Sequence, residues 1–400
     1  MTNRGRGKRK GEGKGKGNMS ETKSSSSAAM SSCNFPQDLI VQILSRLPVK
    51  SLLRFKSVSK PWLVLIKNPK FISLHLNHTD MNPKNDAVII HGLSLWYDHI
   101  MSLCNVNPID NKPINLDHPF PEIFLQMDLV GSCNGLVCLG CPPLGQMIVL
   151  WNPSTRMYKT IRLPSTKMDQ GEVDKVSLGL GFDPVENDHK IVRIMCMRPK
   201  MPKKIQVKVQ VYSVNRDSWK RIQVETPFYL FQTRCNAIVK GIPYWTAFIE
   251  SESKFLEVLL FFDTQNEVFL QGAVPNFPMG EGTNARLVEL KDGLASLVYY
   301  LSEESNKGVC VDVWVLDDCK KSWSKKFSVG PIPFKVERLI QCSKNGEIVA
   351  EGTKGKLFLY DPKTNGIKNI SIDEVQAHSY EAFSYTESLV SIKGMKQLGL

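Results

Sequence analysis

Apolar positions follow a helical period only near the start of the chain, in FPQDLIVQILSRLPVKSLLRFKSVSKPWLVLI, residues 35–66. Pro36 suits the first position of a helix, Pro48 ends that helix, and Ser59 can cap a third one. The apolar residues of the first segment recur at i, i+1, i+4, i+5 and i+8, which is one face of a helix: Leu39, Ile40, Ile43, Leu44 and Leu47. The pattern predicts three short helices.

The three predicted helices carry more apolar side chains than they can bury against one another. Leu52 and Phe55 belong to the second segment, and Trp62 and Ile66 to the third. Units below about 40 residues rarely hold a core without staples or partners. We therefore expect a surplus apolar face, and such a face marks a site for a partner.

After Asn77 the pattern changes to short apolar runs that alternate with Gly, Pro, Asn and Asp turns, which indicates an all-β region. One unit recurs: an apolar strand that ends in an aromatic residue, a polar turn, and a second strand. The aromatic markers lie 61, 50, 52 and 46 residues apart: Trp151, Tyr212, Phe262, Trp314 and Tyr360. A period of about 50 is typical of a four-stranded propeller blade. The spacing favours a propeller of roughly six irregular blades, with a large β-sandwich as the alternative.

Charge separates the first residues from the rest of the chain. The formal net charge is +12, and residues 1–18 contribute half of it in a Gly/Lys/Arg stretch. With the serine run that follows, residues 1–32 are predicted to be a disordered tail. The tail could be a nuclear address, a nonspecific contact for nucleic-acid phosphates or an inert extension. No apolar segment suits export or membrane spanning, so we expect nucleus and cytoplasm, with ten reduced cysteines.

The helical stretch resembles the F-box. The resemblance rests on Phe35-Pro36, Ile43-Leu44, Leu47-Pro48, Leu52-Leu53, Arg54-Phe55 and the Val58 to Trp62 segment. It implies docking onto a SKP-type adaptor, which bridges to the cullin and RING subunits of a ubiquitin ligase. By position, the resemblance places these residues at or near the adaptor: Phe35, Pro36, Ile40, Ile43, Leu44, Leu47, Pro48 and Leu52.

The β region resembles the plant F-box-associated interaction domain. The matching segments are GSCNGLVCL, LWNPSTR, GLGFDPVENDHKIVRI, VKGIPYWTA, LLFFDTQNEVF and VDVWVLDD, and the likeness covers about residues 85–375. The two resemblances together imply a non-catalytic substrate receptor of an SCF-type ligase, with no cofactor and with an unidentified target protein bound by the β domain. Polar, irregular segments are candidates for target binding: 164–173, 198–204, 249–254, 275–283 and 302–307.

The expected fold is mainly β with a small N-terminal α module: a three-helix F-box followed by a kelch-like β-propeller. The expected domains are a tail at 1–32, the F-box at 33–77, the β domain at 78–386 and a C-terminal tail at 387–400. Which residues of the β domain contact the target is left open.

Two segments of the β region carry patterns that would suit other chemistries. Gly131-Ser-Cys133-Asn-Gly135 imitates a nucleophile elbow, but a strand follows it, and Asn134-Gly135 between apolar runs favours a type I′ hairpin. Cys133, Cys138 and Cys141 could suggest zinc, but a fourth ligand is missing, so buried thiols are the preferred interpretation. A cysteine hydrolase on the β domain, and a nucleic-acid-binding or scaffold protein acting through the basic tail, stay as alternative functions. Nucleic acid and membrane are not expected as partners.

Overall fold

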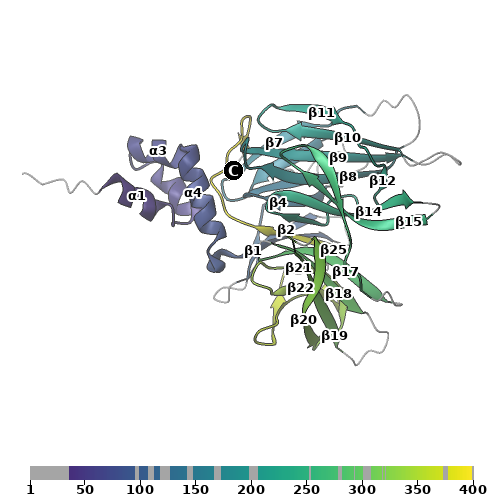
Figure 1. The fold of residues 1–400 in the computed structure, drawn as a ribbon. Helices are drawn as coiled ribbons and strands as arrows, with labels where there is room; N and C mark the ends of the chain where they lie inside the picture. Colours follow the sequence, from purple (N-terminus) through teal and green to yellow (C-terminus); the bar gives the residue numbers. More distant parts are fainter. Residues whose placement is uncertain are drawn as a thin grey trace, which may run out of the picture.

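A computed structural model describes most of the chain beyond the basic tail and shows a group of helices beside a ring of sheets (Figure 1). The described residues are 36–94, 99–106, 112–117, 127–141, 147–165, 173–197, 206–251, 254–277, 282–291, 293–300, 308–317, 319, 321–372 and 377–398. The predicted tail, residues 1–32, lies outside them.

Four α-helices form the N-terminal module: α1 (Gln37–Leu44), α2 (Val49–Phe55), α3 (Lys60–Lys67) and α4 (Pro69–Asp80), followed by a 3-10 turn, η1 (Pro83–Asn85). The first three are the predicted ones, and Ser59 caps α3 by accepting a hydrogen bond from the Trp62 N–H. The fourth helix was not predicted. Asn68 ends α3 and also caps α4, where Pro69 occupies the first helical position. An Asn-Pro pair that looks like a stop therefore also starts a helix.

The described strands form six sheets, which we name blades A to F in chain order. Blade A holds β1 (Ala87–Ser94), β2 (His99–Asn105), β3 (Ile114–Asn115) and β25 (Ala377–Tyr385), and blade B holds β4 (Asp128–Cys133), β5 (Leu136–Gly140), β6 (Met147–Asn152), β7 (Met157–Arg162) and β26 (Lys396–Gln397). Blade C holds β8 (Val173–Asp183), β9 (Asp188–Met197), β10 (Gln206–Ser213) and β11 (Ser218–Ile222).

Blade D holds β12 (Phe228–Tyr229), β13 (Ala237–Val239), β14 (Ile242–Ser251), β15 (Lys254–Asp263) and β16 (Val268–Gly272). Blade E holds β17 (Thr283–Leu290), β18 (Gly293–Tyr300), β19 (Val309–Asp317) and β20 (Ser322–Ile332), and blade F holds β21 (Val336–Cys342), β22 (Ile348–Gly352), β23 (Leu357–Asp361) and β24 (Gly366–Ile370). The prediction of about six blades is confirmed, and the alternative of a large β-sandwich is wrong.

The ring is closed by a strand from the end of the chain. β25 is the inner strand of blade A and pairs antiparallel with β1, so one blade contains both early and late strands. Starting at β25, the strand contacts run to β4, β8, β14 with its partner β13, β17, β21 and back to β25, and β13 also touches β4. Closure packs the described inner strands against those of neighbouring blades, so that only short, protected edges remain.

The aromatic markers of blades B, C, D and F directly precede the turn after the strand, and the blade E marker, Trp314, lies two residues earlier. They lie in β6, β10, β15, β19 and β23, which is the third strand of blades B to F in each case. A polar side chain then starts the turn: the Oδ1 atoms of Asn152, Asp263 and Asp361 accept hydrogen bonds from backbone N–H groups two residues on. A residue with positive φ ends each turn, such as Arg156 (φ 56°) and Asn365 (φ 54°). The repeat therefore encodes both a core position and the hairpin after it.

Tryptophans join neighbouring blades. Trp151 and Trp245 are fully buried. The indole N–H of Trp219 in blade C donates to the Arg162 carbonyl at the end of blade B, 3.0 Å away. Trp323 in blade E makes the equivalent bond to the Ala273 carbonyl beyond blade D, at 2.6 Å.

The two ends of the ring differ. A small cavity of about 100 Å³ is lined by residues near the ends of β4, β13, β17 and β25 together with Asp80 of α4, so these inner strands all run toward the helical module. Strand direction alternates within a blade, so the five segments predicted to bind the target connect strands at the end of the ring away from the helical module. They are 164–173, 198–204, 249–254, 275–283 and 302–307. Most residues of these five segments lie outside the described part of the chain.

Candidate functional site

The helical module has a small core that depends on a residue from the far end of the chain. Leu44, Val49, Leu52, Ile66 and Phe71 are buried together, and Leu389 is the sixth buried member of the same cluster. Phe55 and Trp62 add an edge-to-face contact, with ring centroids 5.3 Å apart. The module therefore does not enclose its core alone, in agreement with its small size.

Apolar side chains also face outward from this module, as the sequence predicted. On α1, Leu39 is 45% exposed and Ile43 is 56% exposed, and their spacing of four residues places them on one face. We name these two residues the α1 stripe. Val58 after α2 and Val64 on α3 are exposed as well. Two adjacent large aliphatic side chains on one helical face are suited to a protein partner.

The structure divides the residues that the F-box resemblance assigned to the adaptor. Pro36, Pro48 and Ile43 are exposed, and Ile40 and Leu47 are half-buried against the module core. Leu44 and Leu52 are 2% and 0% exposed, so both belong to the module core itself. Phe35 lies outside the described residues. Leu39, which was absent from that group, is the other member of the α1 stripe, and its place four residues before Ile43 is the signal that could have identified it.

A segment beyond β25, residues 386–398, crosses from the ring to the helices, and we name it the C-terminal strap (Figure 1). The Asn152 side-chain amide donates to the carbonyls of Ser388 and Val390 at 3.0 and 2.8 Å. The Glu387 carboxylate accepts from the Val49 N–H at the start of α2, at 3.4 Å. Where it is described, the expected tail 387–400 is thus packed between the two parts of the molecule.

A second connection joins α4 to the ring. Asp80 accepts from Lys344 Nζ at 2.5 Å and from the Thr386 hydroxyl at 2.6 Å. The Asn345 N–H donates to Asp86 at 3.1 Å, and burial raises the pKa of that carboxyl group. With the strap, these contacts fix the orientation of the helical module on the propeller.

Charged side chains meet across the propeller axis at Glu381 on β25. Arg234, Arg286 and Arg338 all form ion pairs with its carboxylate, and they come from blades D, E and F or the segment that leads into them. Burial opposes ionisation of Glu381, but the charges of Arg286 and Arg234 outweigh it and lower the pKa to about 2. Arg338 also pairs with Glu351 at 2.8 Å, so two carboxylates face three guanidinium groups. The cluster links four blades, which indicates a structural role.

Cys133 lies in a hairpin and not at a nucleophile elbow. Asn134 and Gly135 both have positive φ, 48° and 74°, and they connect β4 to β5 as a type I′ turn. Burial raises the pKa of the Cys133 thiol, whereas a nucleophilic cysteine needs a lowered one. The nearby His189 donates to the Cys133 carbonyl at 3.3 Å. Cys138 is likewise buried, as predicted, whereas Cys141 is only partly buried.

Within the described ranges, no cluster of three or more His, Cys, Asp or Glu side chains could hold a metal ion. No helix in the described part of the chain is long and apolar enough to cross a bilayer.

Comparison with known proteins matches both parts of the chain. Residues 32–74 match the F-box domain, and residues 95–392 match the F-box associated beta propeller domain. Among curated proteins, the F-box protein CPR1 of Arabidopsis thaliana is 25% identical over 379 residues, covering 89% of this chain and 88% of that protein. The F-box protein At4g22390 of the same plant is 28% identical over 376 residues, covering 86% and 87%. The propeller match alone extends over more than half of the chain, and the chain belongs to the family of F-box proteins with an F-box-associated β-propeller.

Proposed function

We propose that this chain is the target-recognition subunit of an SCF-type ubiquitin ligase. The helical module binds a SKP-type adaptor and, through it, the cullin and RING subunits. The propeller binds a target protein and promotes its ubiquitination and degradation. The catalytic transfer of ubiquitin belongs to the partner subunits.

The α1 stripe is the observation that best supports this proposal. The inner side of the module is committed to its own core and to Leu389, while Leu39 and Ile43 have no such role. The proposed contact surface is the α1 stripe with Pro36, Ile40, Leu47 and Pro48, whereas Leu44 and Leu52 support it from beneath. Phe35, next to Pro36 in sequence, stays a proposed contact.

The mechanism is positioning. A target held on the ring and a ligase held on the helices react as parts of one assembly, which raises their effective concentration. This works best when the two binding parts keep a fixed geometry. The strap and the Asp80–Lys344 pair supply that geometry on this chain. The strands flanking the long segments end on the ring face away from the helices, and target binding is proposed there.

The test is co-purification with a plant SKP-type adaptor, comparing wild type with Ile43→Asp. A charge placed in a desolvated apolar contact costs several kcal/mol, so we expect the stoichiometric complex to be lost. Val185→Asp is the matched control, because Val185 is 77% exposed on a blade C turn. Leu52→Asp would be uninformative, since it buries a charge inside the module.

Retention of the adaptor by Ile43→Asp, or no complex with wild type, would contradict the proposed dock. The ubiquitination step is tested separately by reconstituting the full ligase with this chain and following ubiquitin on proteins that co-purify with the propeller. We also propose residence in nucleus and cytoplasm, on the basis of the basic stretch at 1–18. A fluorescent fusion with and without this stretch tests that.

A further inference from the structure

The outer part of blade C contains an incomplete sheet edge. β11 pairs with β10 from Ser213↔Ser218 to Val209↔Ile222 and goes no further, although β10 continues to Gln206 and stays paired with β9 over that length. No other described strand pairs with the outer edge of β10 at 206–208. A strand edge that is open in this way is a template for an added strand.

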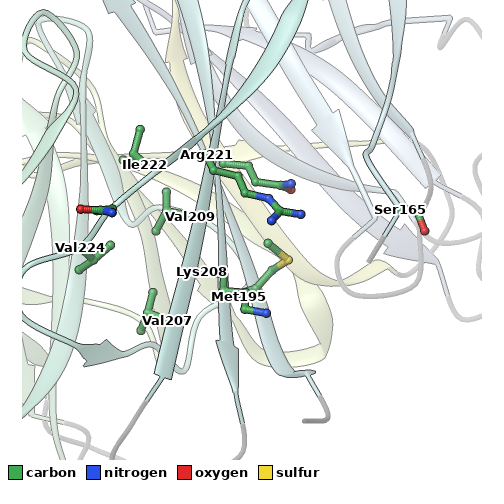
Figure 2. A pocket seen from close by; sticks show the side chains of 10 residues that line it. Ser165, Met195, Val207, Lys208, Val209, Arg221, Ile222 and Val224 are labelled. Carbon is green, nitrogen blue, oxygen red and sulfur yellow. The ribbon is translucent and has the colours of Figure 1, made fainter. Parts of the chain in front are cut away.

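A cavity of about 610 Å³ lies at this edge (Figure 2). Its lining comes from both faces of the blade, since side chains alternate along a strand. Figure 2 shows Val207, Val209 and Val224 on one side of β10, with Lys208 and Arg221 on the other. The cavity therefore surrounds the position that a further strand, in line with β11, would occupy.

The two sides differ in chemistry. Val207, Ile222 and Val224 are only partly buried and pack against the largest core cluster of the ring. Apolar side chains of a guest strand would extend that core. The opposite side presents Lys208, Gln210 and Arg221, and the lining of the cavity contains no carboxylate.

A row of basic residues runs across the polar side. In register, Arg193 on β9 lies opposite Gln210 on β10, which lies opposite Arg221 on β11. Arg193 Nη1 donates to Gln210 Oε1 at 3.1 Å, so the Gln210 amide nitrogen is left as a donor. Arg193 is 4% exposed, its Nε has no partner, and neither it nor Arg221 has a carboxylate partner among the described residues. Arg193 also donates to the Pro164 carbonyl at 3.1 Å and does not line the cavity, whereas Arg221 does. The exposed guanidinium of Arg221, with the positive charge of Arg193 beneath it, favours an acidic ligand.

We infer that the open edge of β10 binds an extended segment of a target protein as an added strand, with alternating apolar and acidic side chains. The apolar set lies on Val207, Ile222 and Val224, and the acidic set lies over Arg221. This inference deepens the proposed function, because it names the surface and the kind of target segment. It locates target binding at the end of blade C away from the helical module.

The experiment uses the full chain without adaptor and a fluorescent peptide of alternating valine and glutamate. Binding is measured by fluorescence anisotropy, with a valine–lysine peptide as the charge-reversed probe. We expect the acidic peptide to bind and Arg221→Glu to weaken its binding by about tenfold or more. Lys363→Glu, in an exposed turn of blade F, is the matched control and leaves binding unchanged. Equal binding of both peptides, or no effect of Arg221→Glu, would overturn the charge assignment.

Backbone methylation of the peptide tests the added strand itself. Alternate N–H groups of a strand point to opposite edges, and a guest strand pairs through only one edge. Methylating one alternate set of nitrogens should abolish binding, while methylating the other set should spare it. Loss with both sets, or with neither, contradicts strand addition. The assay is independent of the adaptor, so failure here leaves the co-purification result standing, and the reverse also holds.

Discussion

At the scale of single residues, the ring depends on a charge balance at its centre. Glu381 faces Arg234, Arg286 and Arg338 and is itself nearly buried. Glu381→Gln would leave Arg234 and Arg286 without their shared counter-ion, while Arg338 would keep Glu351. We expect the free energy of unfolding to fall by about 3 kcal/mol or more, since removing one partner of a buried ion pair leaves an uncompensated charge. Urea unfolding followed by tryptophan fluorescence measures the change.

The control for Glu381 is a second substitution that removes one of the opposing charges. Glu381→Gln combined with Arg286→Gln should be less destabilising than the two single changes added together, because the partners act on the same charge balance. If the losses of unfolding free energy of the two single variants added up to that of the double variant, the cluster would not be electrostatically coupled. This would contradict the role assigned to Glu381.

His189 predicts how stability responds to mild acid. Burial lowers its pKa from the ordinary 6.5 to about 4. Below pH 6.5 the unfolded chain binds a proton there and the folded chain does not, so stability is complete above that pH and falls as the pH drops toward 4. The loss by pH 5 should be about 2 kcal/mol. Unfolding by urea at pH 7.5 and at pH 5 checks it.

His189→Gln isolates this effect, because the amide can still donate to the Cys133 carbonyl but does not titrate. Burial also lowers the pKa of His75, so part of the pH dependence stays in the variant. The difference in free energy of unfolding between wild type and variant should therefore become smaller at acid pH. An equal loss in both proteins would mean that His189 is not held neutral in the fold.

At the scale of elements, the sequence predicts the helices and strands that have a local pattern of apolar and turn residues. The aromatic markers identify the third strand of five blades because each precedes a turn with its own residue chemistry. In blade E the marker is Trp314, yet the position before the turn is Leu316, two residues on and on the same face. The strand and its turn are therefore conserved in blade E although the residue before the turn is not aromatic. The strap has no such signal, since its apolar residues do not alternate along the chain as in a strand: Leu389, Val390, Ile392, Met395 and Leu398.

The strap predicts that the helical module is stabilised from the end of the chain. Leu389 is 3% exposed inside the module core. Leu389→Ala should cost about 2–5 kcal/mol of module stability through lost burial and the cavity left behind. Hydrogen exchange of α2 and α3 amides should accelerate, while that of β8 and β9 should not. Leu256→Ala, at a leucine 48% exposed on β15, is the matched control; equal exchange in both variants would contradict the role of Leu389.

At the scale of the whole molecule, the same segment closes the ring and then fixes the module. β25 is the inner strand of blade A, and the strap continues from it to α2 and to β7, which pairs with β26. The two ends of the ring thereby acquire different tasks. The helices and their apolar stripe lie at one end, and the open edge of β10 lies toward the other. A ligase and a target held at opposite ends would keep a fixed separation.

This arrangement makes a prediction about stepwise truncation from the C-terminus. A chain ended after Tyr385 keeps β25 and loses the strap, so the propeller should still unfold cooperatively while the α helices become protease-sensitive. A chain ended before Ala377 also loses the pairing of β25 with β1, which opens the ring and exposes the edges of blades A, B and F. Its cooperative transition in calorimetry should disappear. Retention of that transition would show that the remaining strands hold the ring without closure. If the chain ended after Tyr385 lost the cooperative unfolding of the propeller as well, the strap and the ring would fold as one unit.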